Sequence, residues 1–153
     1  MIRMLLTATA ALGLATAAGA VDWRTTQDAY ESGVFLDVSS YRVLPDGHRR
    51  IWILQTSPKP LEASGGLVDF RIDLFEFDCA GRTVAVKYAA VTFMDGRTAS
   101  NETSGAASPI APGTNADRMA EVVCGDMTRL TTVPGGAPDI AHRYRAIAKI
   151  LFH

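Results

Sequence analysis

Residues 67–94 read LVDFRIDLFEFDCAGRTVAVKYAAVTFM, and this stretch decides the fold that we expect. Apolar and polar residues alternate along both halves, as they do in strands that bury one face. Ala80-Gly81 lies between the halves and suits a tight turn that pairs Cys79 with Arg82. The stretch therefore predicts one long β-hairpin, with Phe77 opposite Val84 and Phe75 opposite Val86. The alternative is that each strand pairs with other neighbours.

The apolar residues of this hairpin change face partway along it. Phe75 and Phe77 share one face near the turn, whereas the apolar positions farther from the turn fall on the other face. The expected pairs there are Val68 with Phe93, Phe70 with Val91, and Ile72 with Ala89. A single β-bulge would shift one strand against the other, so the matched change predicts a strongly twisted ribbon without a bulge. Its tip would bury one face and its base the other.

The composition is that of a globular protein. The chain has 153 residues, of which 48% are hydrophobic and 20% charged, and these values fit one domain with its own core. The formal net charge is -1. A charge so close to zero gives no reason to expect a nucleic-acid partner.

Residues 1–20 have the three parts of a secretory signal peptide. Arg3 supplies the positive start, Met4–Ala17 is apolar, and Ala18-Gly19-Ala20 fits a small-residue cleavage site. We therefore expect a periplasmic or secreted protein that begins at Val21, with no transmembrane segment in the mature chain. No cysteine lies near the cleavage site, so we expect no lipid anchor through a cysteine at the start of the mature chain. The alternative is an uncleaved N-terminal anchor.

Cys79 and Cys124 are the two cysteines of the chain. In an oxidising compartment such a pair most often forms an internal disulfide, with free thiols or intermolecular bonds as the alternatives. Closing this loop would stabilise the fold by about 4 kcal/mol. His48, His142 and His153 add no metal-ligand spacing, and we therefore expect neither a metal nor a cofactor.

Two helices are predicted after the hairpin. The first begins after the N-cap Thr114 and ends at Cys124, where the disulfide would attach it to the hairpin tip. Its apolar face consists of Ala116, Met119, Ala120 and Val123. The second helix runs from Pro138 to about Phe152. Its apolar stripe consists of Ile140, Tyr144, Ile147 and Leu151.

The second helix also carries basic side chains that lie mostly off this stripe. We predict Arg143, Arg145 and Lys149 as candidate partner-binding residues, because a basic amphipathic helix can make weak contact with an anionic surface. The alternative is that the helix docks on its own domain and leaves its basic side in water.

Several shorter signals complete the expected layout. Val34–Val38 is a strand that Asp37 and the serines after it should end, and Pro45-Asp46-Gly47 is the turn of a second hairpin. Ser57–Gly66 and Thr98–Ser108 are expected to be loops, because the first is rich in Pro and Gly and the second in small polar residues.

The predicted fold class is α+β. We expect an antiparallel twisted β-sheet with a short helix tethered by a disulfide and an additional C-terminal helix. The expected ranges are a signal peptide at 1–20, a sheet domain at 21–125, a linker at 126–137 and the C-terminal amphipathic helix at 138–153.

No catalytic motif is found, although carboxylates gather in one stretch. Asp69 and Asp73 share one side of the predicted strand, and Glu76 lies on the other. We expect a half-solvated strand on which Arg71 and Lys87 pair with these carboxylates. A glycosidase would need two carboxylates that converge on a cleft, and the pattern does not supply them. We therefore predict that the protein is not an enzyme.

Three segments resemble a known family. FLDVSSYRVLPDGHRRIWIL (35–54) resembles the N-terminal part of the surface-adhesin protein E family. FEFDCAGRTVAVKY (75–88) is similar to its Asp-Cys strand with the next hairpin partner, and PIAPGTNADRMAEVVCG (109–125) is similar to its turn, short helix and closing cysteine. The resemblance covers roughly residues 34–125. It implies an antiparallel sheet with a helix held by a disulfide between Cys79 and Cys124, and a role in adhesion to host proteins.

Three hypotheses about function follow. The first is a non-enzymatic exported binding domain for an unknown protein or envelope component, which would use one sheet face together with Ser57–Gly66 or Thr98–Ser108. The second is a periplasmic inhibitor or accessory factor that inserts a loop into an envelope enzyme. The third is an enzyme, whose hydrolase activity would be lost on Asp69→Asn or Asp73→Asn.

Overall fold

The structure is a computed structural model that describes residues 20–26, 30–103 and 105–151. Apart from Ala20, the predicted signal peptide lies outside the described residues, as does Phe152 at the predicted end of the last helix.

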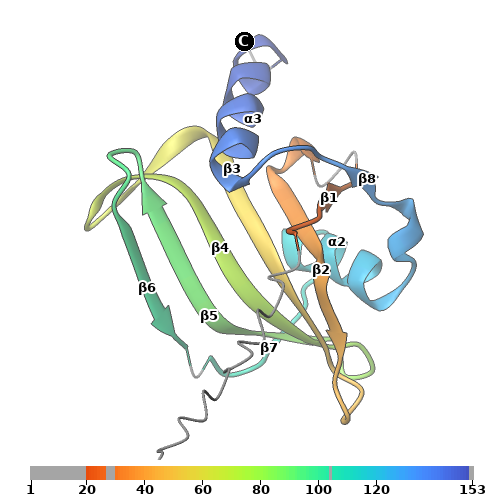
Figure 1. The fold of residues 1–153 in the computed structure, drawn as a ribbon. Coiled ribbons are helices and arrows are strands. Elements are labelled where there is room, and N and C mark those ends of the chain that lie inside the picture. The colour runs from red at the N-terminus through yellow and green to blue at the C-terminus, as the bar shows by residue number, and fades with distance from the viewer. Residues whose placement is uncertain (1–19, 27–29, 104, 152–153) are drawn as a thin grey trace, which may run out of the picture.

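One antiparallel sheet forms the body of the molecule, and its strands bend strongly along their length (Figure 1). Its strand order is β6-β5-β4-β3-β2-β1-β8, and β7 also pairs with β5. The strands are β1 (Trp23–Thr25), β2 (Val34–Val43), β3 (Arg49–Ala63), β4 (Gly66–Asp78), β5 (Thr83–Phe93), β6 (Thr98–Glu102), β7 (Ser108–Pro109) and β8 (Thr131–Thr132). The helices are α2 (Asn115–Cys124), the 3-10 helix η1 (Met127–Arg129) and α3 (Ala137–Leu151). The predicted α+β class is confirmed.

β4 and β5 form the predicted hairpin. Phe77 pairs with Val84 and Phe75 with Val86, as expected from the turn. The turn itself is wider than predicted, because Asp78 and Thr83 are the last pair and Cys79 and Arg82 belong to the turn.

The prediction of a ribbon without bulges is wrong. Lys87 is an extra residue on β5, and Asp69 is an extra residue on β4, so the register shifts twice. Between the two shifts Phe70 pairs with Thr92 and Ile72 with Ala90, one residue away from the predicted partners. The shifts occur on opposite strands and cancel, so Val68 still pairs with Phe93. Because the shifts cancel, the sequence pattern alone does not reveal them.

Both segments predicted as loops contribute strands. β3 continues to Ala63, and its irregular part at residues 57–60 lies between the pairs Thr56–Phe70 and Leu61–Val68. Pro58 and Pro60 fall in this interruption, where the missing N–H groups cost no ladder hydrogen bond. Residues 98–102 form β6, which pairs with β5 along its whole length.

β2 also runs farther than predicted. The serines after Asp37 lie at a register shift between Asp37 and Arg42, and the strand then continues to Val43. Asp37 accepts a hydrogen bond from the backbone N–H of Ser39 at 3.1 Å, which is the local bond that the sequence suggested. This bond stabilises the bulge and does not end the strand.

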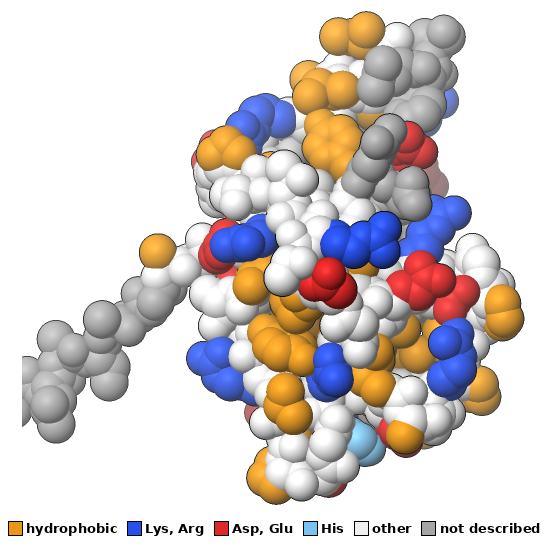
Figure 2. Space-filling view, turned by 90° about the vertical axis from the view of Figure 1, so that its right-hand side faces the viewer, with side chains coloured by type: hydrophobic (Ala, Val, Ile, Leu, Met, Phe, Trp, Pro, Cys, Tyr) orange, Lys and Arg blue, Asp and Glu red, His pale blue; other side chains and the backbone are white. Residues whose placement is uncertain are grey.

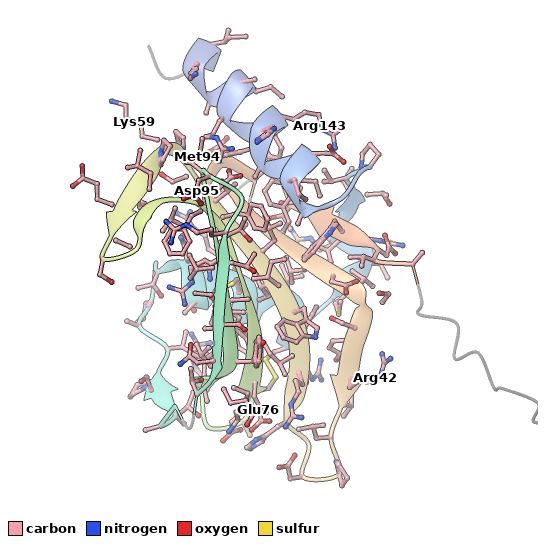
Figure 3. The ribbon with its side chains drawn as sticks, turned by 60° about the vertical axis from the view of Figure 1, so that its left-hand side comes forward. Arg42, Lys59, Glu76, Met94, Asp95 and Arg143 are labelled. Atoms are coloured by element: carbon pink, nitrogen blue, oxygen red, sulfur yellow. A yellow bond between two sulfur atoms is a disulfide. The ribbon has the colours of Figure 1, made fainter. Side chains whose placement is uncertain are left out.

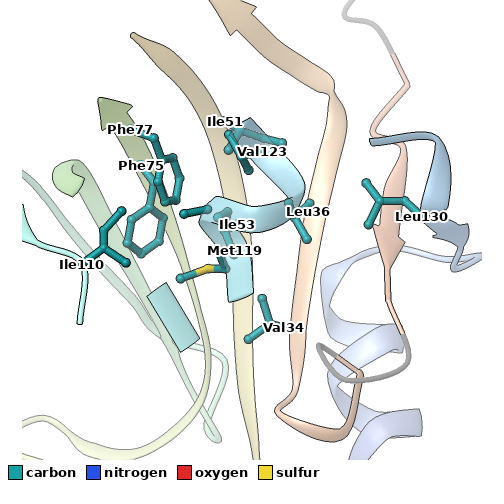
Figure 4. Close-up of a cluster of buried hydrophobic side chains, with 11 residues drawn as sticks. Val34, Leu36, Ile51, Ile53, Phe75, Phe77, Ile110, Met119, Val123 and Leu130 are labelled. Atoms are coloured by element: carbon teal, nitrogen blue, oxygen red, sulfur yellow. The ribbon is translucent and has the colours of Figure 1, made fainter. Parts of the chain in front are cut away.

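Two apolar clusters lie on opposite faces of the sheet. Phe75 and Phe77 pack under α2 with Ile51, Ile53, Met119, Val123 and their neighbours (Figure 4). On the other face, Phe70 packs under α3 with Trp23, Phe35, Leu54, Ile140, Ala141 and Tyr144. The predicted change of face is therefore confirmed on β4. It is wrong for β5, because the extra residue Lys87 leaves Val91, the partner of Arg71, on the same face as Val84 and Val86.

The disulfide and the first helix agree with the sequence. Cys79 in the hairpin turn is bonded to Cys124, the last residue of α2. Thr114 is the N-cap of α2, and its side chain accepts a hydrogen bond from the backbone N–H of Asp117 at 3.3 Å. The buried side chains of α2 are Met119, Ala120 and Val123.

The segment at 126–137 is held against the sheet. It contains η1 and β8, and β8 pairs with β1. Leu130, between these two elements, is buried in the cluster under α2. The chain between α2 and α3 is thus part of the fold and not a free connection.

Candidate functional site

The face of the sheet that carries α2 is only partly covered by that helix. Two hollows of about 410 Å³ and about 420 Å³ lie in the uncovered part, and Asn115 of α2 lines the first of them. Leu61, Val68 and Arg71 line both hollows, so we treat them as two lobes of one cleft. We call the lobe beside Asn115 and Tyr144 the inner lobe, and the lobe beside β6 the edge lobe. The cleft is the candidate binding site.

Polar side chains of β3 and β4 are fixed on the wall of the inner lobe. The Nε2 atom of Gln55 donates to an Oδ atom of Asp73 at 2.9 Å, and the guanidinium of Arg71 pairs with Asp73 at 2.8 Å. Asp73 itself is fully buried. One buried carboxylate therefore orients two polar groups that line the cleft.

Burial is also the main influence on the charge of Asp73. It raises the pKa of Asp73, although hydrogen bonds from Arg71 and Gln55 act in the opposite direction. A carboxyl group with a raised pKa binds more protons in the folded state than in the unfolded state. Asp73 therefore makes the free energy of unfolding fall as the pH rises above its unfolded pKa, about 3.9, and through its folded pKa.

We expect Asp73→Asn to remove this pH dependence. Relative to wild type, the variant should be more stable at pH 7 than at pH 4, as measured by the free energy of unfolding in urea at both pH values. Glu76→Gln is the control with the opposite pH dependence. Burial alone would raise the pKa of Glu76, but Arg50 and Lys87 lower it below its ordinary value. A difference for Asp73→Asn that is the same at both pH values would contradict this account.

The floor of the inner lobe is tied to α3. An Oδ atom of Asp69 pairs with Nη2 of Arg145, and both side chains are 9% exposed. The Nη1 atom of Arg145 also donates to the backbone O of Asp69 at 2.9 Å. Beside it, the hydroxyl of Tyr144 donates to the backbone O of Glu31 at 2.9 Å. The lobe thus sits where α3 meets β4.

The edge lobe is mainly apolar, and its roof is the turn between β3 and β4. Its apolar lining consists of Leu61, Val68, Val91, Phe93 and Ala99. Arg97 holds the turn in place, because its Nη2 atom donates to the backbone O of Gly65 at 2.8 Å and its guanidinium lies 5.2 Å from the centre of the Phe93 ring.

The three basic residues predicted on the C-terminal helix have different surroundings. Arg145 is buried by its contacts with Asp69, so it is not available at the surface. Arg143 is exposed on α3 (Figure 3), and its guanidinium donates to the backbone O of Pro134. Lys149 is exposed near the end of the same helix. Ile150, also on this outer part of α3, is 79% exposed, and Figure 1 shows the helix projecting beyond the sheet.

The carboxylates of β4 differ from the expectation of a half-solvated strand. Asp69 and Asp73 are buried, and each is paired with an arginine. Glu76 pairs with Arg50 and with Lys87, the latter as predicted. Each carboxylate is thus neutralised by a cation, an arrangement typical of structural ion pairs. Within residues 20–26, 30–103 and 105–151, no group of three or more His, Cys, Asp or Glu is placed to hold a metal ion.

One face of the molecule can be seen to carry mixed charge. Figure 2 shows Lys and Arg side chains interspersed with Asp and Glu over the face that it presents. None of the helices in the described part of the chain is both long and apolar enough to span a bilayer. A curved antiparallel sheet, a disulfide-tethered helix and an open cleft define an α+β domain with a candidate binding site.

The comparisons with known proteins agree with this class. The family model of Surface-adhesin protein E matches residues 23–125, and the chain belongs to that family. The resemblance seen in the sequence is confirmed, and the match also includes β1. No curated protein sequence matches the chain.

Two solved structures of protein E are similar to this chain. The structure of protein E from non-typeable Haemophilus influenzae is 13% identical, with a TM-score of 0.51, and the match covers 86% of this chain and 92% of that one. Crystal form II of Haemophilus influenzae protein E is 15% identical, with a TM-score of 0.49, and the match covers 60% of this chain and 80% of that one. The first of these likenesses supports the fold.

Proposed function

We propose that the protein is an exported, non-enzymatic binding domain that holds a protein or an envelope component in the two-lobed cleft. Residues 1–20 would direct its export to the periplasm or beyond. The observation that carries the proposal is the cleft itself, in which Gln55 and Arg71 are fixed by buried Asp73 beside an apolar lobe. A cleft with an apolar lining and a few oriented polar groups is the usual form of a binding site.

The cleft also unites the two segments that we expected to bind a partner. Residues 61–65 from β3 and its turn face residues 99–101 of β6 across the edge lobe. Because both segments are paired as strands, the walls of the lobe are ordered before a partner arrives. A preformed site loses less conformational entropy on binding than a flexible one.

The alternative of an inhibitor that inserts a loop finds less support. It requires a free loop at Ser57–Gly66 or Thr98–Ser108, whereas both segments contribute strands to the sheet. We therefore prefer a partner that enters the cleft over a loop that enters the partner.

The outer part of α3 supports a second, weaker contact. Lys149 and Arg143 are exposed there together with Ile147 and Ile150. We keep these two basic residues as candidates for contact with an anionic surface, since exposed apolar and basic side chains on one helix favour such a surface. Arg145 is left out because it is buried.

The proposal predicts that Leu61→Glu abolishes binding. Leu61 lines both lobes and is 60% exposed, so a glutamate there places a charge in the cleft without disturbing the core. We expect capture of a partner from envelope extract by the immobilised protein to fall at least about tenfold, which corresponds to about 1.4 kcal/mol. The readout is quantitative mass spectrometry of the captured proteins.

Val43→Glu is the matched control. Val43 is likewise an exposed strand residue, 62% accessible, and it does not line the cleft. This variant should capture the same proteins as wild type. Equal capture by all three forms would show that the cleft is not the binding site.

A further inference from the structure

β6 ends the sheet on one side, and its outer edge faces away from β5. No other strand pairs with this edge within the described part of the chain. All five residues of β6, Thr98–Glu102, are exposed. An edge of this kind presents main-chain hydrogen-bonding groups that an added strand can use.

The hydrogen bonds between β5 and β6 show which groups point outward. The backbone N–H of Phe93 donates to the O of Arg97, and the N–H of Thr103 donates to the O of Lys87. In an antiparallel pair, alternate residues direct both of their main-chain groups at the partner strand. The odd-numbered residues of β6 therefore bond to β5. The N–H and C=O groups of Thr98, Ser100 and Glu102 point outward.

Two other edges of the sheet are protected in ways that β6 is not. β8, at the opposite end of the sheet, is two residues long. The part of β5 nearest the hairpin turn is covered by β7, whose Pro109 has no N–H to offer. β6 contains neither proline nor lysine, the residues that commonly block an edge strand.

A binding pocket lies beside this open edge. Ala99 and Asn101 line the edge lobe, and they are the two neighbours of Ser100 on β6. A strand added to β6 would place its side chains opposite Ala99 and Asn101 on the same face, because neighbouring strands share their pleat. Those side chains would lie at the lobe formed by Leu61, Val91 and Phe93.

We propose that a partner protein adds an extended segment to β6 and places an apolar side chain in the edge lobe. The outward groups of Thr98, Ser100 and Glu102 would supply the main-chain bonds, and the lobe would select the side chain. This inference rests on the proposed function, since it specifies how the partner occupies the cleft.

The test uses the peptide Ac-Lys-Thr-Val-Thr-Val-Thr-Val-Lys-amide and the purified protein labelled with ¹⁵N. Without peptide, the amides of Thr98, Ser100 and Glu102 should exchange with solvent much faster than those of Ala99 and Asn101. With saturating peptide, the three outward amides should exchange about tenfold more slowly, as main-chain pairing protects them. The same peptide with alanine in place of valine should protect them less, because alanine does not fill the lobe.

Two controls separate strand addition from binding of another kind. The peptide with all backbone nitrogens methylated should give no protection. Ser100→Pro removes one outward N–H but leaves the bonds to β5, so it should abolish protection at Thr98 and Glu102, whereas Ser100→Ala should retain it. A urea unfolding curve will show that both variants are folded.

Three outcomes would overturn the inference: unchanged exchange with saturating peptide, equal protection by the methylated peptide, or protection that rises with protein concentration alone. The last outcome would mean that a second copy occupies the edge. If the peptide fails while Leu61→Glu still abolishes capture, strand addition is wrong and the proposed function stands. If Leu61→Glu has no effect, the proposed function fails whatever the peptide does.

Discussion

Replacing Arg145 by methionine is expected to lower the free energy of unfolding by about 3–5 kcal/mol, because it removes the arginine that pairs with the buried carboxylate of Asp69. The side chains of both residues are 9% exposed. Methionine keeps most of the volume of the arginine stem, so the loss would come from the charge and from the hydrogen bond to the backbone O of Asp69. The measurement is urea unfolding at neutral pH.

Arg143→Met is the matched control on the same helix. Arg143 is exposed, so this variant should change the free energy of unfolding by about 0.5 kcal/mol or less. Combining Asp69→Asn with Arg145→Met should recover much of the loss, because no unpaired charge then remains buried. Equal effects of the two arginine substitutions would show that the ion pair does not hold α3 on the sheet.

Removal of the disulfide should have the other large effect. The double variant Cys79→Ala, Cys124→Ala opens a loop with a sequence separation of 45 residues, for which the chain-entropy model gives about 4 kcal/mol. The bond holds the last residue of α2 against the hairpin turn, beside the buried side chains of Val123 and Phe77. Its loss would free the end of that helix.

Urea unfolding with and without dithiothreitol measures this contribution. Wild type in dithiothreitol should unfold at the same urea concentration as the double variant in its absence, and the variant should not respond to the reductant. If the reductant leaves the wild-type curve unchanged although both thiols become alkylatable, the disulfide does not stabilise the fold.

Local patterns predicted the elements whose signals are contained within a few residues. The position of the hairpin, the N-cap at Thr114 and the buried face of α2 each depend on neighbours in sequence, and the structure has them, although the hairpin turn is wider than predicted. The disulfide was predicted from the count of two cysteines and from the expected oxidising compartment. The sequence pattern does not reveal the two bulges of the hairpin. They lie on opposite strands, so the pairing outside them keeps the predicted register.

Strand pairing with distant neighbours overrode other local signals. Pro58 and Pro60 indicate a loop by themselves, but the strands on either side of them are held by pairing with β4. The small polar residues of β6 have weak strand propensity, and β5 provides the partner that orders them. The prediction of loops at these two places therefore failed for the same reason.

The candidate site was the least predictable part. Gln55, Arg71 and Asn115 come from three elements, and no motif links them before the chain folds. Asp73 gave no distinct signal, because Asp69, Arg71 and Glu76 alternate with apolar residues on the same strand and suggest a half-solvated face. Arg145 was predicted as a surface residue but is buried against Asp69. Helical spacing shows where a side chain points and not which buried carboxylate it meets.

The second apolar cluster has a practical consequence for anyone who expresses this protein. The family match ends at residue 125, yet Phe35, Leu54 and Phe70 are covered by side chains of α3, which begins at Ala137. A recombinant fragment trimmed to the matched boundaries would present these apolar side chains to water and tend to precipitate. Shortened versions of the chain should therefore retain the C-terminal helix.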